Sequence, residues 1–395
     1  MAQASLEPLF TTKEIVIFSG SGGVGKTSIA AGAALGAASR IGGKVLVLTI
    51  DPAKRLADAL GLEGIGNIER RVPDDAFKAA GLEPRGELWA AMLDTKQSWD
   101  ELVMRHAPDA ETAYRILDNR LYHNLTARFV QSHDYIAMER LYELHEQGKY
   151  DLIVIDTPPS RNALDFLDAP QRMAEFFGGR LLRWLTMPYR VGGRRGARMI
   201  NVASRPFYQI ADRLLGSQFL QDIAEFFLNF QAMYDGFVER AKSVERLLHD
   251  RRTSFAVVTT LESAPLHEAE SFCDELVRRK YPLGALVLNK TLPPYLLSSE
   301  ASDAAARLVA DSGPLGAQLA ELDIPALADA ARNGRVLATI GESFLNYAVV
   351  ARREAELRTE LARRPDIVVD VPNLDSDITD VAGLARLARL LLPPS

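Results

Sequence analysis

The chain has 395 residues, of which 47% are hydrophobic and 25% charged, and its formal net charge is −6 at pH 7. This acidic balance argues against a general nucleic-acid-binding protein, and the single cysteine, Cys273, excludes intrachain disulfides and thiolate metal clusters within one chain. Since no apolar stretch approaches the roughly 18–20 residues that cross a bilayer, and no signal-type segment opens the sequence, a cytoplasmic protein without a transmembrane span is expected.

The first predicted strand, 15–18, leads into a complete phosphate-binding loop of the pattern G-x-x-x-x-G-K-[ST]. Its glycines allow backbone N–H groups to face phosphates, Lys26 can reach the β- and γ-phosphates, and Thr27 can ligate Mg²⁺. A helix of small residues follows, which completes the strand–loop–helix setting of this motif. The predicted nucleotide-binding residues are Gly20, Ser21, Gly22, Gly23, Val24, Gly25, Lys26, Thr27 and Ser28.

Two further predicted strands are followed by a carboxylate. Asp51 comes just after strand 45–49 and before Pro52, where it can accept a hydrogen bond from the attacking water. Asp156 directly follows strand 152–155 and is a candidate Walker B carboxylate for the Mg²⁺ shell. The alternative for each is a cap on the following turn or helix.

Short apolar runs alternate with helical segments, which predicts an α/β fold with a doubly wound, mostly parallel sheet. Ligands of such sheets bind beyond the carboxyl ends of the strands, where these motifs lie. The strand signal disappears between 168 and 250, so this part is predicted to be an inserted helical subdomain. Segments 1–167 and 251–335 then form the ATPase domain, and 336–395 is a helical extension with a final strand and helix. The predicted strands are 15–18, 45–49, 88–93, 152–155, 255–259, 285–288 and 367–371.

The helical insertion carries two apolar clusters with two possible roles. They pack on each other as an ordinary helical core, or they form a groove that accepts an apolar client helix. The client-facing candidates are Phe176, Phe177, Trp184, Phe226, Phe230 and Met233.

The last helix, from about residue 381, has Leu384, Leu387 and Leu391 on one face. A membrane-binding amphipathic helix would show this pattern. Because a predicted strand comes just before it, packing of this helix back onto the sheet is the favoured alternative.

Three segments together resemble the ArsA-type ATPases: GSGGVGKT (20–27), IDPAKRLADAL (50–60) and DTPPSRNALDFLDAP (156–170). That family includes arsenite-efflux ATPase subunits and the ATPase that targets tail-anchored membrane proteins, and it belongs to the dimeric P-loop class of MinD and ParA. Two later segments, VVTTLE (257–262) and VLNK (287–290), are also similar to family segments.

The resemblance implies a role for each matching residue. Asp51 would position the attacking water, Lys26 and Thr27 would hold phosphate and Mg²⁺, and Asp156 would be the Walker B carboxylate. Asn289 would bind adenine, which favours ATP over GTP, and Glu262 would contact the nucleotide.

The sequence departs from the family pattern at three places. Ser21 stands where the family has a lysine that reaches the partner's phosphates, so the chain is expected to be a slow ATPase or one half of a heterodimer with a paralogous ATPase. Cys273 alone cannot build a metalloid site, which argues against metalloid efflux. Switch II reads Ser160-Arg161-Asn162-Ala163, and no role is carried over to Arg161 or Asn162.

The resulting expectation is a Mg²⁺-dependent ATPase that acts as a nucleotide-gated dimeric switch, as a homodimer or heterodimer. Its expected clients are hydrophobic helical protein segments, as in membrane-protein targeting or chaperoning. The alternatives are a MinD-like ATPase that positions itself on membranes and a low-turnover regulatory subunit of a heteromer.

Overall fold

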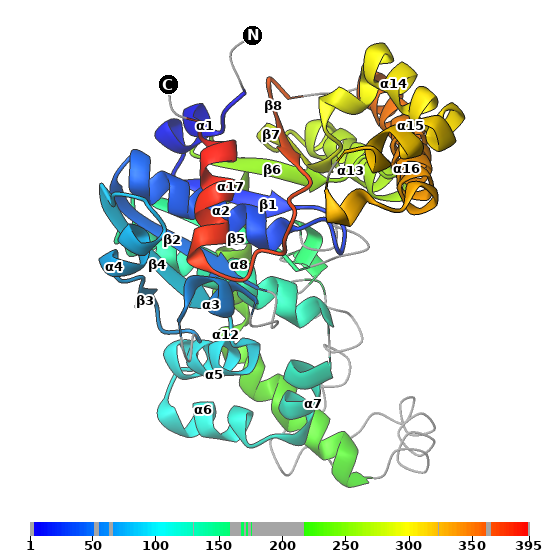
Figure 1. Ribbon diagram of the computed structural model, residues 1–395. Coiled ribbons are helices and arrows are strands. Elements are labelled where there is room, and N and C mark those ends of the chain that lie inside the picture. The colour runs from blue at the N-terminus through cyan, green and yellow to red at the C-terminus, as the bar shows by residue number, and fades with distance from the viewer. Residues whose placement is uncertain are drawn as a thin grey trace.

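The computed structural model describes residues 4–50, 55–62, 66–128, 130–158, 167–169, 171–172, 175, 217–322, 324–360 and 365–393. Its centre is one eight-stranded sheet (Figure 1). In chain order the strands are β1 (Ile15–Ser19), β2 (Gly43–Thr49), β3 (Arg70–Arg71), β4 (Gly86–Met92), β5 (Leu152–Asp156), β6 (Thr253–Thr259), β7 (Leu283–Thr291) and β8 (Ile367–Pro372).

The helices flank and extend this sheet. They are α1 (Glu7–Thr12), α2 (Lys26–Arg40), α3 (Arg55–Leu60), α4 (Asp74–Ala79), α5 (Thr95–His106), α6 (Ala110–Leu117), α7 (Arg120–Arg128), α8 (Val130–Glu146), α12 (Ser217–His249), α13 (Ser263–Arg278), α14 (Ser299–Ala310), α15 (Ser312–Ala320), α16 (Ala330–Glu360) and α17 (Val381–Leu391). Two short 3₁₀ helices, η2 (Pro294–Leu297) and η3 (Pro325–Leu327), lie within the same C-terminal region. No helix in the described ranges combines the length and apolarity needed to cross a bilayer.

The strand order is β3-β4-β2-β5-β1-β6-β7-β8, and every neighbouring pair is parallel except β3 with β4. The doubly wound, mostly parallel sheet is therefore confirmed, with all seven predicted strands in it. The strand that the sequence analysis missed, β3, has only two residues, both exposed arginines, so it has no apolar pattern. β1 lies at the centre between β5 and β6, which brings the loop after β1 and the end of β5 together.

The C-terminal helix packs on the sheet domain rather than standing free. The face of α17 that carries Leu384, Leu387 and Leu391 is buried against α2. Small residues on α2 permit the close approach, since a Cβ at Gly32 would lie 2.8 Å from the Cβ of Leu387. The packing alternative for this helix is confirmed, and β8 adds the preceding segment to the edge of the sheet.

A helical lobe extends away from the sheet, in the lower part of Figure 1. It combines α12, from the predicted insertion, with α5, α6 and α7, from a segment that the sequence analysis did not assign to it. Phe226, Phe230 and Met233 on α12 are 0%, 2% and 2% exposed, and they belong to the core with Trp99 and Phe237. These three side chains are therefore buried in a core shared with α5, and their role as client contacts stays a prediction. The other client candidates, Phe176, Phe177 and Trp184, lie outside the described residues.

A second helical unit, formed by α14, α15 and α16, lies beside the β7–β8 side of the sheet (Figure 1). It begins at Ser299, earlier than the predicted boundary at 336. The helices that the sequence analysis divided between the ATPase domain and the extension therefore pack as one unit, while β8 and α17 return to the main sheet.

Candidate nucleotide-binding site

The phosphate-binding loop joins the carboxyl end of β1 to the start of α2. Two of its glycines are required by their surroundings. A Cβ at Gly20 would lie 2.1 Å from the carbonyl oxygen of Val258 on β6. Gly25 has a φ of 90° in the left-handed region, and a Cβ there would lie 2.5 Å from Nδ2 of Asn289. The loop therefore packs closely against Val258 at the end of β6 and Asn289 at the end of β7, and these contacts restrict its conformation.

Lys26 is the first residue of α2 and is 6% exposed. Its Nζ donates a hydrogen bond to the carbonyl oxygen of Ser21 at 2.9 Å, so the ammonium lies over the loop. A cation in this position, above a ring of backbone N–H groups at a helix N-terminus, suits a bound phosphate.

Asp156 lies at the end of β5, next to β1, and its side chain is fully buried. Its Oδ2 accepts a hydrogen bond from Oγ1 of Thr27 at 2.7 Å and another from Oγ1 of Thr49 at 2.9 Å. The two predicted Mg²⁺ residues, Thr27 and Asp156, are therefore in direct contact. A hydroxyl and a carboxylate oxygen are the hard donors that Mg²⁺ prefers, and with nucleotide phosphates they would form a suitable ligand set.

Asn289 and Lys290 at the end of β7 bind two consecutive carbonyls of the loop. Nδ2 of Asn289 donates to the carbonyl oxygen of Val24 at 2.7 Å, and Nζ of Lys290 donates to that of Gly23 at 3.3 Å. Lys290 has a φ of 56°, a left-handed conformation that a lysine adopts at a cost of about 1 kcal/mol or more. We call this pair of contacts the N-K clamp.

The sequence analysis assigned Asn289 to adenine and gave Lys290 no role. The structure places Asn289 beside the loop, where its adenine contact stays a prediction. Lys290 was missed because nothing in its local sequence shows contact with a loop 267 positions away. A lysine following a candidate base-binding asparagine was the available signal.

Of the two remaining predicted residues, the structure describes Glu262. Glu262 is exposed just before α13, beside the carboxyl end of β6. It lies near Glu354 of α16, which accepts a hydrogen bond from the backbone N–H of Leu292 at 3.2 Å; burial, with the charge of Glu262 as a smaller cause, raises the pKa of Glu354. Asp51 lies outside the described residues, so its role stays a prediction.

The N-K clamp yields a first testable prediction. Lys290→Met is expected to raise the dissociation constant for ATP about tenfold, because the loop loses a charged hydrogen bond and a nearby cation. Lys290→Arg should retain most of the affinity. Titration with a fluorescent ATP analogue measures both.

Lys280 supplies a matched control for this prediction. It is the other non-glycine residue with positive φ in the described ranges, at 61°, but it precedes β7 at the opposite edge of the sheet. Lys280→Met should leave the ATP affinity unchanged. Equal affinities for the two methionine variants would show that the clamp has no role in nucleotide binding.

Comparison with known proteins shows that the sequence of this chain is similar to those of a family of ATPases. A family model described as anion-transporting ATPase (ArsA) matches residues 13–307. A protein of Aquifex aeolicus named as an arsenical pump-driving ATPase is 24% identical over 303 residues, 72% of this chain but 65% of that protein, so the chain spans less than two thirds of it. ATPase BagA of Mycobacterium tuberculosis is 23% identical over 392 residues, 95% of this chain and 91% of the relative. ATPase GET3 of Komagataella phaffii is 22% identical over 308 residues, 74% and 77% of the two chains.

Proposed function

Since this chain belongs to the anion-transporting ATPase (ArsA) family and is an ATP-hydrolysing enzyme, we propose that it acts as a Mg²⁺-dependent, nucleotide-gated dimeric switch that binds hydrophobic protein segments. The observation that carries the proposal is the direct contact between Thr27 and Asp156 beneath the phosphate loop. It supports a site in which nucleotide binding rearranges contacts of the protein itself.

The residues of the chain have separate roles in this proposal. The loop N–H groups and Lys26 bind the phosphates, and Lys26 exchanges the carbonyl of Ser21 for a phosphate oxygen. Thr27 and Asp156 would hold Mg²⁺, and the metal would supply positive charge against the charge that develops on the phosphates. Asp51 orients the attacking water. The N-K clamp keeps the loop in its binding conformation.

The identity of the second subunit depends on Ser21. A serine cannot supply a cation to the partner's phosphates, so a homodimer would turn over slowly, and a heterodimer with a lysine-bearing paralogue would turn over faster. Both forms agree with the proposed switch, and a low-turnover regulatory subunit remains the second candidate.

The proposed client is an apolar protein helix. Beyond the family resemblance, the support is an exposed apolar stripe on α16, formed by Val336, Ile340, Tyr347 and Val350. At helical spacing these four positions lie within an arc of about 80° and extend along roughly 21 Å of the helix. An exposed apolar stripe of this kind favours binding to another protein.

Two alternatives have weaker support. A MinD-like membrane anchor would use the apolar face of α17, which is buried against α2 in this structure. A metalloid pump would need thiolates, but Cys273 is buried in α13, and burial raises the pKa of its thiol to about 12. We therefore propose a cytoplasmic protein-binding ATPase rather than an arsenite pump.

A defined apolar peptide tests the client proposal. The full chain with Asp51→Asn, held with Mg·ATP, is expected to bind a fluorescent 20-residue apolar helix, and to bind it at least tenfold more weakly with Mg·ADP. Fluorescence anisotropy measures the affinity in both nucleotide states.

Two variants of α16 make this test specific. Ile340→Asp with Tyr347→Asp should weaken peptide binding about tenfold or more, because two charges would enter the contact. Val349→Asp is the matched control, since Val349 is also exposed on α16 but points away from the stripe. Peptide binding that is independent of nucleotide would contradict the switch, and equal effects of the two changes would contradict the stripe.

A further inference from the structure

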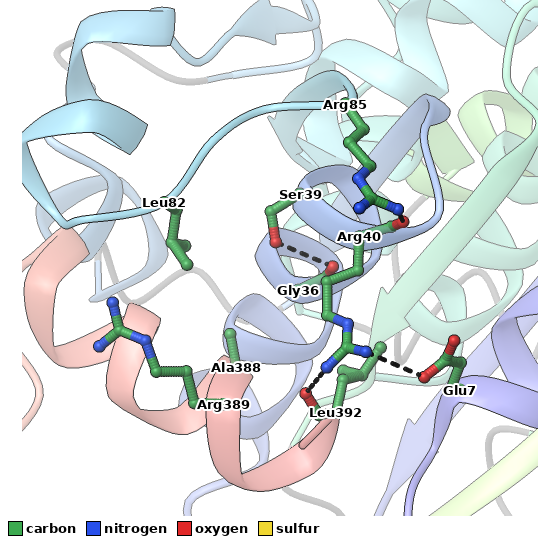
Figure 2. Close-up of a pocket in the computed structure, with 9 residues that line it drawn as sticks. All are labelled: Glu7, Gly36, Ser39, Arg40, Leu82, Arg85, Ala388, Arg389 and Leu392. Atoms are coloured by element: carbon green, nitrogen blue, oxygen red, sulfur yellow. Dashed lines mark hydrogen bonds and ion pairs between the residues drawn. The ribbon is translucent and has the colours of Figure 1, made fainter. Parts of the chain in front are cut away.

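A cavity of about 520 Å³ lies at the end of α2 that is farthest from the phosphate loop (Figure 2). Its walls come from α1, the end of α2, the segment before β4, and α17. Since α2 has 15 residues, the cavity and the loop are about 22 Å apart along this helix. The volume is within the range of small-molecule sites, about 300–1,000 Å³.

Three arginines from three separate segments of the chain line this cavity: Arg40, Arg85 and Arg389. The one lining carboxylate is Glu7, whose Oε2 lies 3.5 Å from Arg40. In the described part of the chain, neither Arg85 nor Arg389 forms an ion pair with a carboxylate. The lining therefore has three cations and one anion, which leaves two positive charges in excess.

Backbone carbonyls accept hydrogen bonds from all three guanidinium groups, and Figure 2 shows the bond from Arg40 to Leu392. Arg40 donates from Nη1 to Leu392 at 2.7 Å, and Arg85 donates from Nη1 to the carbonyl of Arg40 at 3.0 Å. Arg389 uses Nη2 for both of its bonds, to Ala80 at 3.2 Å and to Gly81 at 3.0 Å. A guanidinium has five N–H donors, so these bonds orient Arg85 and Arg389 while leaving donors on each for a ligand.

The rest of the lining combines apolar surface with one hydroxyl. Leu82, Ala388 and Leu392 supply the apolar contacts, and Ser39 donates its own proton to the carbonyl of Gly36 at 3.0 Å. A ligand that fits would combine a short carbon skeleton with acceptor oxygens that match a guanidinium fork.

We propose that this cavity is a binding site for a small organic dianion, a phosphate monoester or a dicarboxylate, held mainly by Arg85 and Arg389. Two negative charges match the two excess positive charges of the lining. The site is independent of the ATPase chemistry, because none of its residues belongs to the phosphate loop or the N-K clamp. The competing role of these arginines is to cap helix-end carbonyls only, and this role predicts no ligand.

Calorimetric titration of the full chain tests the proposal. The phosphate loop is first saturated with Mg·ADP so that it cannot bind the added anions. Glycerol 3-phosphate and succinate are then titrated in separate experiments. Both dianions are expected to bind the wild-type chain with sub-millimolar dissociation constants. Arg85→Gln with Arg389→Gln should weaken binding at least tenfold, since each change removes a charged donor.

Arg386→Gln is the matched control. Arg386 is exposed on the same helix, α17, but its guanidinium bonds to Oγ of Ser376 rather than lining the cavity. Undiminished binding of the dianions to the double variant would overturn the proposal. So would a wild-type chain that binds neither the soluble dianions nor phosphatidic acid vesicles. Sedimentation of those vesicles that depends on Arg85 and Arg389, without binding of the soluble dianions, would instead identify the phosphate monoester as a lipid headgroup.

Discussion

Replacement of Asp156 by asparagine is expected to lower kcat for ATP by about 100-fold and to raise the Mg²⁺ concentration required for half-maximal turnover. Asp156 is fully buried and accepts hydrogen bonds from both Thr27 and Thr49, so its charge acts where the metal and the β- and γ-phosphates would lie. Asparagine has the same shape and can still accept one of these bonds, so the fold should be retained. Phosphate release measured across a Mg²⁺ titration gives both quantities.

Asp151 supplies the control for this change. It precedes β5 at the opposite edge of the sheet, where it is exposed and accepts a hydrogen bond from the backbone N–H of Lys44 at 2.7 Å. Asp151→Asn should leave turnover within about twofold of the wild type, as is usual for surface changes away from a site. If both variants kept wild-type turnover and Mg²⁺ dependence, Asp156 would have no role at the metal.

The second large effect is expected on stability, at a buried ion pair that joins α8 to the helical lobe. Nε of Arg240 on α12 lies 2.5 Å from Oε1 of Glu139 on α8, and their side chains are 17% and 8% exposed. The guanidinium also lies over the ring of Phe237, and the hydroxyl of Tyr135 donates to Glu139 at 2.9 Å. Burial lowers the pKa of His106 to about 4, so this histidine is neutral and its Nδ1 accepts a bond from Arg240 at 3.3 Å.

Arg240→Ala is expected to lower the free energy of unfolding by about 3 kcal/mol at pH 7, because it leaves the Glu139 carboxylate buried and unpaired. Burial already raises the pKa of Glu139 above its ordinary value, and loss of the cation would raise this pKa further. A protonated Glu139 tolerates burial without a partner. The stability loss should therefore be largest above the pKa of Glu139 in the folded variant, and it should shrink as the pH falls toward 4.5, the ordinary pKa of a glutamate. Urea unfolding followed by tryptophan fluorescence, at pH 7 and pH 5, measures the difference.

Two comparisons make this result specific. Arg115→Ala removes a surface pair with Glu111, whose side chains are 59% and 77% exposed, and should cost no more than about 0.5 kcal/mol. The triple change Tyr135→Phe, Glu139→Leu and Arg240→Met should recover most of the loss, because neither an unpaired charge nor a buried hydroxyl without an acceptor then remains. A loss as small for Arg240→Ala as for Arg115→Ala would show that the pair does not stabilise the lobe.

The parts of the fold that the sequence predicted are those with local signals. The strands of the sheet are short apolar runs, and the phosphate loop is a contiguous motif, so both could be identified without knowing any contact. The location of Thr27 and Asp156 at the same edge of the sheet was expected from the rule that ligands bind beyond the carboxyl ends of parallel strands, but their hydrogen bond was not predicted. The packing of α17 followed from the strand that precedes it.

The features that the sequence did not predict depend on contacts between distant positions. The rings of Trp99 on α5 and Phe237 on α12 stack with their centroids 6.2 Å apart. No local sequence pattern shows that these two segments form one lobe. The same holds for Lys290, which reaches Gly23, and for the cavity arginines, which come from three separate segments. For Phe226 and Phe230 the local pattern was visible but could not decide between two roles. An aromatic stripe has the same sequence pattern whether it faces a core or a client.

The central claim is that the phosphate-loop site hydrolyses ATP with Asp51 positioning the water. It is tested most directly by phosphate release from the full chain with Mg·ATP, measured beside Asp51→Asn, with ATP binding followed in both. We predict slow release by the wild-type chain, faster release by Ser21→Lys, and ATP binding without release by Asp51→Asn. Equal release by the wild type and Asp51→Asn, or release that persists when Mg²⁺ is removed, would contradict the claim.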